Sequence, residues 1–237
     1  MRNRLDCLLA LLILAAPSVS GGESLFHRAL RLEPSAGNPR NSEGDFIQLR
    51  DGRVLFIYTH FTSGAADDAT AHLASRESRD GGLTWSTNDV VVVANEGGRN
   101  VMSVSLVRLR SGPIALFYLR KNSKSDCRPL VRFSRDEAQS WSAPAEVITN
   151  EIGYYVLNNN RVVQLTSGRL MVPVAQHARA DGKWQPGEVL CYRSDDEGRS
   201  WHAAAQRLTA HAAGKPVDLM EPGVVETEAD HLFMILR

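Results

Sequence analysis

The octapeptide at residues 78–85 (SRDGGLTW) decides the fold, because the chain repeats it at 134–141 (SRDEAQSW) and at 194–201 (SDDEGRSW). The shared pattern is S-x-D-x-G-x-[ST]-W, and the second copy has Ala138 at the glycine position. Successive copies start 56 and 60 residues apart. Asp and Ser side chains bind nearby backbone N–H groups in tight turns, glycine tolerates a positive φ, and tryptophan buries a large ring. The pattern therefore predicts hairpin turns within a repeat architecture.

A second periodic feature alternates with the octapeptides and consists of an apolar strand, a tight DG or SG turn and another apolar strand. Its clear copies turn at Gly52, Gly112 and Gly168, and a degraded fourth copy covers residues 223–236. Outer strands are expected at 89–93 and 145–148, and no helix of ten residues or more is expected in the mature chain. Each unit is thus predicted to run strand, tight turn, strand, loop, strand, octapeptide turn, strand.

Four antiparallel strands in a unit of about 60 residues are typical of a β-propeller blade, and propellers contain roughly 4–8 blades. About three and a half such blades are present, counted from residue 46. An open arc would expose strand edges, so we expect residues 40–237 to be the N-terminal part of a longer propeller, with 21–39 leading into it. A Greek-key β-sandwich is the alternative all-β fold, but it does not predict this regular recurrence.

Charge and the N-terminal segment narrow the class of protein. The 27 Lys and Arg residues balance 27 Asp and Glu residues, which argues against binding to nucleic acid or to an anionic membrane. Arg2 and Arg4 precede an apolar run too short to cross a bilayer, followed by small residues. Residues 1–20 are therefore predicted to be a signal peptide of a secreted or periplasmic protein with no membrane span.

The cysteines and the octapeptide aspartates are interpreted as structural. An exported protein could pair Cys127 with Cys191, and two unpaired buried thiols fit the sequence equally well. No CxxC, HExxH or comparable ligand spacing occurs, so neither a metal nor a cofactor is expected. Asp80, Asp136 and Asp196 lie at hairpin tips on the outside of a blade and are not expected to be catalytic.

Propeller chemistry is expected instead at the axis, close to the inner strands and the loops between second and third strands. Arg40 precedes the first strand, and Asp67 and Asp68 lie in such a loop. Glu221 opens the innermost strand of the fourth blade, and Arg237 ends the next strand. Each of these charges alone fits a solvated surface position, so the candidate site depends on the set.

The octapeptides resemble the Asp-box, or BNR, repeats of sialidases, whose catalytic domain is a six-bladed propeller. The resemblance covers residues 40–237, and its PRNSEG and GYYVLNN runs are similar to those of the bacterial exo-α-sialidase-like branch. It implies that Arg40 and Arg237 are two of three arginines that bind the substrate. It further implies that Asp68 is the acid/base and that Glu221 is the base.

These residue types suit the chemistry that the resemblance implies. Sialic acid carries a carboxylate at its anomeric carbon, which calls for convergent guanidinium groups. Sialidases use a neutral tyrosine as nucleophile, assisted by the glutamate, because a carboxylate would be repelled there. The third arginine and this tyrosine would lie beyond Arg237, so the chain is expected to be inactive alone. Tyr154 and Tyr155 are expected to line the pocket or its rim, near Asn158, Asn159 and Asn160. Of these, Tyr155 and Asn159 are the expected substrate contacts.

The expected function is that of an exo-α-sialidase, which hydrolyses terminal sialic acids from glycoconjugates with retention. The expected partner is a sialylated glycan or another acidic sugar. A non-catalytic carbohydrate-binding propeller and a propeller glycosidase acting on a different sugar are the alternatives, since a fold does not fix a substrate. Linkage preference and oligomeric state stay open.

Overall fold

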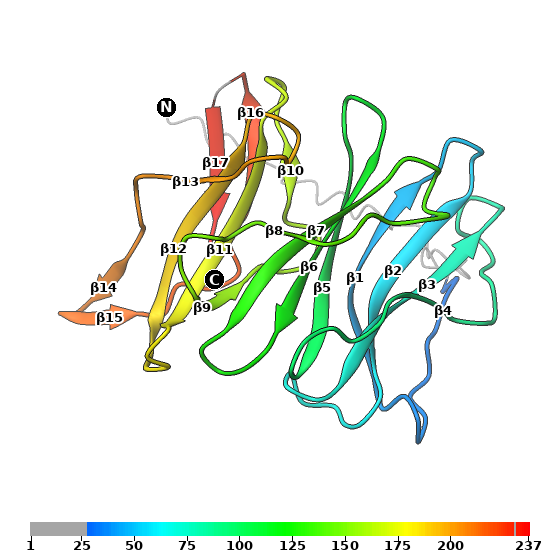
Figure 1. The fold of residues 1–237 in the computed structure, drawn as a ribbon, viewed down its shortest axis with the longest axis horizontal. Helices are drawn as coiled ribbons and strands as arrows, with labels where there is room; N and C mark the ends of the chain where they lie inside the picture. Colours follow the sequence, from blue (N-terminus) through cyan, green and yellow to red (C-terminus); the bar gives the residue numbers. More distant parts are fainter. Residues whose placement is uncertain (1–27, 230) are drawn as a thin grey trace, which may run out of the picture.

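The computed structural model describes residues 28–229 and 231–237, and within them the chain forms strands and no helix. The signal-peptide prediction for residues 1–20 lies outside the described part. Four consecutive units lie side by side in an arc (Figure 1). The predicted all-β fold is confirmed for these residues. The arc does not close into a ring within the described ranges, so the six-bladed form stays a prediction.

Within each of the first three units the strands pair antiparallel and follow one another in sequence. One parallel bridge, between Cys127 and Tyr154, joins the second and third units into a single sheet. Unit 1 contains β1 (Arg40–Gln48), β2 (Val54–Phe61), β3 (Ala71–Ser78) and β4 (Val90–Val93). Unit 2 contains β5 (Asn100–Arg108), β6 (Ile114–Lys121), β7 (Cys127–Ser134) and β8 (Ala145–Glu146). The outer strands β4 and β8 lie where the sequence predicts them.

Unit 3 differs because its innermost strand is split into two pieces that both pair with β11. It contains β9 (Gly153–Val156), β10 (Val163–Gln164), β11 (Leu170–Arg179), β12 (Trp184–Ser194) and β13 (His202–Ala203). A small hairpin follows, made of β14 (Ala210–Ala212) and β15 (Lys215–Val217). Unit 4 is the hairpin of β16 (Gly223–Glu228) and β17 (His231–Ile235).

The hydrophobic core lies in the seams between units. Ile57 and Leu73 of unit 1 pack in one cluster with Ile114 and Leu116 of unit 2, and all four are fully buried. A second cluster joins unit 2 to unit 3, with Tyr155 among its members. Burying each such side chain contributes about 1.5–3 kcal/mol, so each unit depends on its neighbours for stability.

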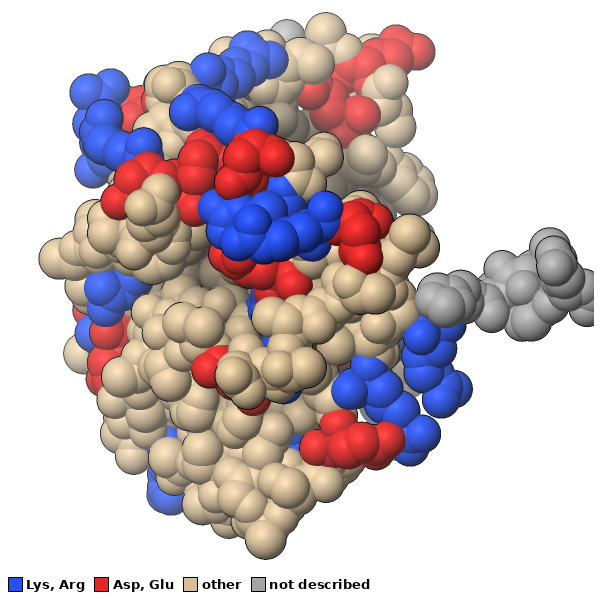
Figure 2. All heavy atoms as spheres, turned by 90° about the vertical axis from the view of Figure 1, so that its right-hand side faces the viewer, with Lys and Arg blue, Asp and Glu red and all other residues tan. Residues whose placement is uncertain are grey.

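The outer side of unit 1 is less completely covered. Phe46, Val90 and Val91 are each more than half exposed there. The space-filling view onto this side shows acidic and basic side chains gathered toward one end and a broad uncharged area toward the other (Figure 2). This end of the arc therefore presents apolar surface to solvent.

The octapeptides form three turns of the same geometry, here called the octapeptide turns. In the first, Ser78 Oγ donates to Asp80 Oδ1 at 2.8 Å and accepts from the N–H of Gly82 at 2.8 Å. Asp80 also accepts from the N–H of Thr84 at 2.8 Å. The hydroxyl of Thr84 donates to Asp80 Oδ2 at 2.5 Å, and this bond and the others favour the ionised form, so together they lower the pKa of Asp80 to about 2. The aspartates therefore hold the turns together.

Both cysteines of the described part are buried free thiols, Cys127 in β7 and Cys191 in β12. Of the two possibilities that the sequence left open, the structure shows the unpaired one. Burial raises the pKa of Cys127 to about 12. None of the described residues lies in a helix long and apolar enough to cross a membrane.

Candidate functional site

The inner strands of the four units share an unusual backbone feature at one end of the molecule. Glu43, Ser103, Asn160 and Glu221 have φ angles of 51°, 60°, 51° and 52°, in the left-handed region that non-glycine residues seldom adopt. In β1 and β5 the strand register shifts at these positions. Such bulges re-aim side chains, and here they direct several of them into one cavity.

The cavity has a volume of about 260 Å³ and collects side chains from all four units. Its apolar floor includes Met102, Leu119 and Val156. Its polar and aromatic lining comprises Glu43, Asp67, Ser103, Lys121, Tyr154, Asn158, His177, Trp184, Glu221 and Arg237. Within the described residues, no group of three or more His, Cys, Asp or Glu side chains is placed to hold a metal ion.

Arg40 and the loop of Asp67 form the first half of the site. Arg40 donates to Asp67 Oδ1 at 2.5 Å and to the carbonyl of Ala65 at 3.0 Å. The guanidinium also lies 4.6 Å above the ring of Phe61. Two side chains of unit 2 fix the loop, because Lys121 Nζ and Asn100 Nδ2 donate to the carbonyl of Asp67 at 2.7 and 2.9 Å. Arg40 is thereby held beside a carboxylate of the cavity.

The structure separates Asp67 from its neighbour Asp68, which the sequence resemblance had selected as the acid. Asp67 lines the cavity, whereas Asp68 is absent from that lining and faces a neighbouring hollow. Both carboxylates are exposed. Of the two, Asp67 is therefore the one placed to act beside Arg40.

Glu221 and Arg237 form the second half of the site. Their side chains make an ion pair of 2.9 Å between Glu221 Oε1 and Arg237 Nη2. The backbones of Met220 and Arg237 exchange two hydrogen bonds of 2.9 Å, which bring the two charges together although they are 16 residues apart. The structure thus places Glu221 and Arg237 in one cavity with Asp67, whereas the predicted Arg40 and Asp68 are not among the residues that line it.

Glu43 is a further carboxylate of the cavity that the sequence reasoning did not select. Its Oε2 accepts a hydrogen bond of 2.9 Å from Ser103 Oγ, and its Oε1 lies 3.8 Å from Arg40 Nη2. Burial raises the pKa of Glu43, and the bond from Ser103 and the charge of Arg40 oppose this only in part. A sequence signal existed, because Glu43 and Ser103 both stand nine residues before a turn glycine.

Tyr155 and Asn159, the predicted substrate contacts, do not face the cavity. Tyr155 is fully buried in the core, and Gln176 Nε2 donates to its hydroxyl at 3.0 Å. Asn159 donates to the carbonyl of Gly44 at 3.2 Å. Their neighbours Tyr154 and Asn158 line the cavity instead. The two predicted segments therefore reach the cavity. Because successive side chains of an extended chain point to opposite sides, the residue that faces the cavity in each segment is the neighbour of the predicted one.

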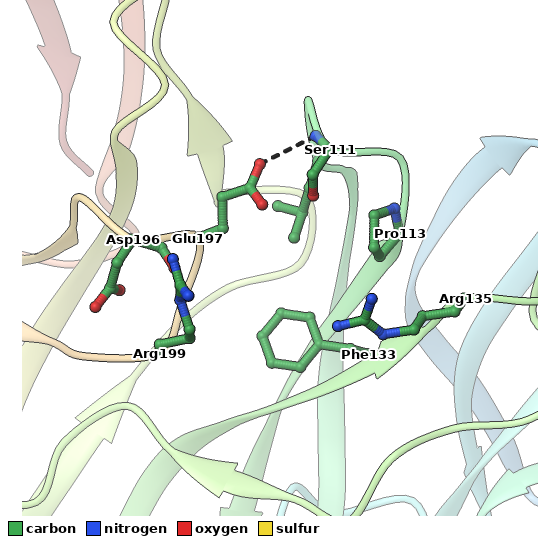
Figure 3. A pocket seen from close by; sticks show the side chains of 8 residues that line it. Ser111, Pro113, Phe133, Arg135, Asp196, Glu197 and Arg199 are labelled. Carbon is green, nitrogen blue, oxygen red and sulfur yellow. Dashed lines mark hydrogen bonds between the residues drawn. The ribbon is translucent and has the colours of Figure 1, made fainter.

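A separate hollow of about 280 Å³ lies on the rim, between unit 2 and the third octapeptide turn (Figure 3). Glu197 reaches across the seam and accepts a hydrogen bond of 3.1 Å from the N–H of Ser111 (Figure 3). Glu137 of the second octapeptide likewise accepts from the N–H of Arg50 in unit 1. None of the predicted site residues lines this hollow, and Glu197, one of its charged groups, joins adjacent units.

Comparison with known families gives one match over most of the chain. The profile of the BNR repeat-like domain matches residues 61–237, which include the loop of Asp67, all three octapeptide turns and the Glu221–Arg237 pair.

Solved structures with the same fold include one protein without an assigned function and several sialidases. A protein of unknown function from Dyadobacter fermentans DSM 18053 matches with a TM-score of 0.69 and 18% identity, over 86% of this chain and 63% of that chain. The Hadza microbial sialidase Hz136 matches with a TM-score of 0.64 and 15% identity, over 85% and 42%. Trypanosoma rangeli sialidase in complex with sialic acid matches with a TM-score of 0.63 and 18% identity, over 87% and 35%.

The chain spans less than two thirds of the length of each of these three proteins. At such identities the likeness establishes the shared all-β, sialidase-like fold.

Proposed function

The chain belongs to the BNR repeat-like domain family, and from this membership and the cavity geometry we propose that it is a sialic-acid-recognising protein of the exo-α-sialidase type. The proposed substrate is a terminal sialic acid on a glycan. Exported sialidases meet such glycans outside the cytoplasm, so we also propose that residues 1–20 direct export. N-terminal sequencing of the mature protein tests that proposal.

One observation carries the proposal: two carboxylates that line a single cavity, Asp67 and Glu221, each contact an arginine, and one of these arginines, Arg237, also lines the cavity. Arg40 contacts Asp67, and Arg237 contacts Glu221. Guanidinium groups are suited to bind the carboxylate of an acidic sugar in a bidentate manner. An incoming substrate carboxylate would compete with Asp67 and Glu221 for these cations, which frees both side chains for proton transfer.

The roles follow from the positions of the two freed carboxylates. Asp67 is proposed to protonate the leaving oxygen, since it lies at the boundary between the cavity and the neighbouring hollow. Glu221 is proposed as the base that activates a tyrosine nucleophile, as in sialidases. Lys121 holds the backbone of Asp67 and lies 5.5 Å from the ring of Tyr154, so it positions two walls of the cavity.

A second candidate function, sugar binding without hydrolysis, is favoured by the positions of the five tyrosines. Four of them direct their hydroxyls to partners remote from Glu221, namely Asp89, Glu96, Gln176 and Asn150 for Tyr58, Tyr118, Tyr155 and Tyr192. The fifth, Tyr154, lines the cavity with its hydroxyl beside Lys121, and burial raises its pKa. Residues 28–229 and 231–237 thus place no tyrosine hydroxyl against Glu221. Recognition without turnover by this chain is the corresponding alternative.

The experiment is a titration of the protein with sialic acid and with its methyl ester, which lacks the negative charge. We expect the acid to bind and the ester to bind at least ~10-fold more weakly, because a charge-assisted contact is lost. The variant Arg237→Gln should remove most of this preference, whereas the rim variant Arg199→Gln should retain it. Equal binding of acid and ester would contradict recognition through the arginines and favour a glycosidase for a neutral sugar. Release of sialic acid from a fluorogenic sialoside separates hydrolysis from binding alone.

A further inference from the structure

Trp184, the first residue of β12, is the one tryptophan of this chain outside the octapeptide turns. Its side chain is 59% exposed, although a large aromatic ring gains free energy from burial. It lines both the cavity and the neighbouring hollow. The indole thus presents aromatic surface to solvent at the edge of a polar cavity.

The structure holds this indole in a defined position. The register of β11 against both β9 and β12 shifts between Gln176 and Ala178, so His177 is the bulged residue. The bulge directs the imidazole beneath the indole, and the two rings stack at 5.1 Å with an interplanar angle of 12°. The ring of Tyr154 lies 5.1 Å from the indole at an angle of 60°. His177 covers one face of the indole, and the exposure leaves the other open.

The imidazole of His177, which supports the indole of Trp184, is buried, and its burial favours the neutral form. His177 is 1% exposed, and burial lowers its pKa. Its Nδ1 lies 3.4 Å from Asp218 Oδ1 and makes no hydrogen bond within the described residues. The ring that stacks on this imidazole is the indole of Trp184.

The hollow beside the cavity has a volume of about 410 Å³ and is bounded by three units. Unit 1 provides Asp67 and Asp68, and unit 3 provides Tyr154 and Trp184. The segments of unit 2 provide Arg99, Lys121, Ser123 and Lys124. Asp67, Lys121, Tyr154 and Trp184 line both spaces, so the hollow opens directly from the cavity. Hydrogen-bond donors thus surround an aromatic wall, which is the chemistry that suits a sugar ring.

We propose that this hollow is the binding subsite for the neutral sugar to which the terminal sialic acid is attached, with the open face of Trp184 stacked on that sugar. The C–H groups on one face of a pyranose ring are apolar and pack on the electron-rich face of an aromatic ring. Ser123, Lys124 and Arg99 are placed to donate hydrogen bonds to the hydroxyl groups at its edge.

Which sugar occupies the hollow and which occupies the cavity is inferred from the proposed function. Asp67 is the proposed donor to the oxygen that joins the two sugars, so the departing sugar must lie where Asp67 faces the hollow. The sialic acid then occupies the cavity with Glu221 and Arg237. The indole is held by His177 and Tyr154 before any ligand arrives, which reduces the entropy lost on binding.

The test compares two probes, a thio-linked 3′-sialyllactose that resists hydrolysis and free sialic acid, on the wild-type protein and on Trp184→Ala. We expect Trp184→Ala to weaken binding of the trisaccharide by ~10-fold and that of free sialic acid by less than ~2-fold. Trp184→Tyr, which retains a ring, should recover most of the loss. Thermal unfolding of each variant checks that the fold is intact.

The outcomes distinguish this subsite from the proposed function. Failure of the wild-type protein to bind either probe would overturn the proposed function itself. Binding of free sialic acid together with an unchanged affinity of Trp184→Ala for the trisaccharide would overturn the subsite alone. An equal loss for both probes would also overturn it, because it would place the indole in the sialic acid site.

Discussion

At the rim of the molecule, serine and aspartate make the same hydrogen bonds in all three octapeptide turns. At the axial end, the inner segments of the four units share a backbone conformation but not one side chain, since the position holds Glu in units 1 and 4, Ser in unit 2 and Asn in unit 3. In the three turns, serine Oγ donates to aspartate Oδ1 at 2.8, 2.8 and 2.7 Å. At the axial end, Glu43, Ser103, Asn160 and Glu221 all have φ between 51° and 60°.

This difference between the octapeptide turns and the axial positions reflects what each depends on. The turn depends on its side chains, because the serine and aspartate accept the N–H groups that the tight backbone leaves unpaired, so these residues recur. The axial conformation depends on the backbone, so the residue at this position can change from unit to unit. Glu43, Ser103 and Glu221 line the cavity, whereas Asn160 does not. Repetition of side chains therefore marks the fold, and repetition of backbone with varied side chains marks the candidate site.

Electrostatics separates the two regions in the same way. Hydrogen bonds to the ionised form lower the pKa of Asp80 and Asp136 to about 2. Burial raises the pKa of Glu43 at the cavity. The rim charges are thus stabilised where they stand, whereas the cavity holds a carboxylate in a place that disfavours its charge, as is common at functional sites.

The largest expected effect is on catalysis at the axial end, where the neighbouring residues Asp67 and Asp68 can be compared. In a form of the protein that hydrolyses a sialoside, Asp67→Asn should lower turnover by at least ~100-fold, because it removes the proposed proton donor. Asp68→Asn, a change of the same chemistry one residue away, should leave turnover within a few-fold of the wild type. Kinetics on the two purified variants decide between them. A larger loss in Asp68→Asn would restore the residue chosen from the sequence resemblance.

An intermediate effect, on stability alone, is expected at the rim. Ser194→Ala leaves the buried N–H of Gly198 without its 2.7 Å acceptor and should lower the free energy of unfolding by about 1–3 kcal/mol. Ser167→Ala, at an exposed turn, is the control and should cost little. Urea unfolding measures both. If the folded Ser194→Ala protein lost affinity for sialic acid, the separation between rim and axial end would fail.

The smallest expected effect is the dependence of stability on pH. The folded-state pKa of Glu43 is raised above its unfolded value, so its ionisation opposes folding, and stability is lost as the pH rises through that interval. The rim aspartates act in the opposite direction, but only as the pH falls below about 4 toward their folded pKa of about 2. Glu43→Gln should therefore be more stable than the wild type at pH 7, and the difference should shrink at pH 4.5.

Arg40, Asp67, Lys121 and Ser103 all face Glu43 and are unchanged in that variant. Unfolding curves at the two pH values, together with Ser103→Ala as a control for the hydrogen bond, isolate the carboxylate. If Glu43→Gln and the wild type differed in stability by the same amount at both pH values, ionisation of the buried Glu43 carboxylate would not be what destabilises the wild type.

The sequence by itself determined the repeat, the strands and the segments that form the site. The octapeptides and the glycine turns are local signals, because a few neighbouring residues supply both the hydrogen bonds and the allowed φ angles. The resemblance to sialidases also selected Glu221 and Arg237, which lie at the two ends of one hairpin. These features need no information from distant parts of the chain.

Only the tertiary structure decided which residue of each adjacent pair faces the cavity. Asp67, Tyr154 and Asn158 line it in place of Asp68, Tyr155 and Asn159. Side chains alternate along an extended chain, so a single bulge or one hydrogen bond from another unit reverses the choice. The carbonyl of Asp67 is held by Lys121 and Asn100, more than thirty residues away. The position of Trp184 was likewise decided by the tertiary structure, since it depends on the bulge at His177, which no local sequence pattern predicts.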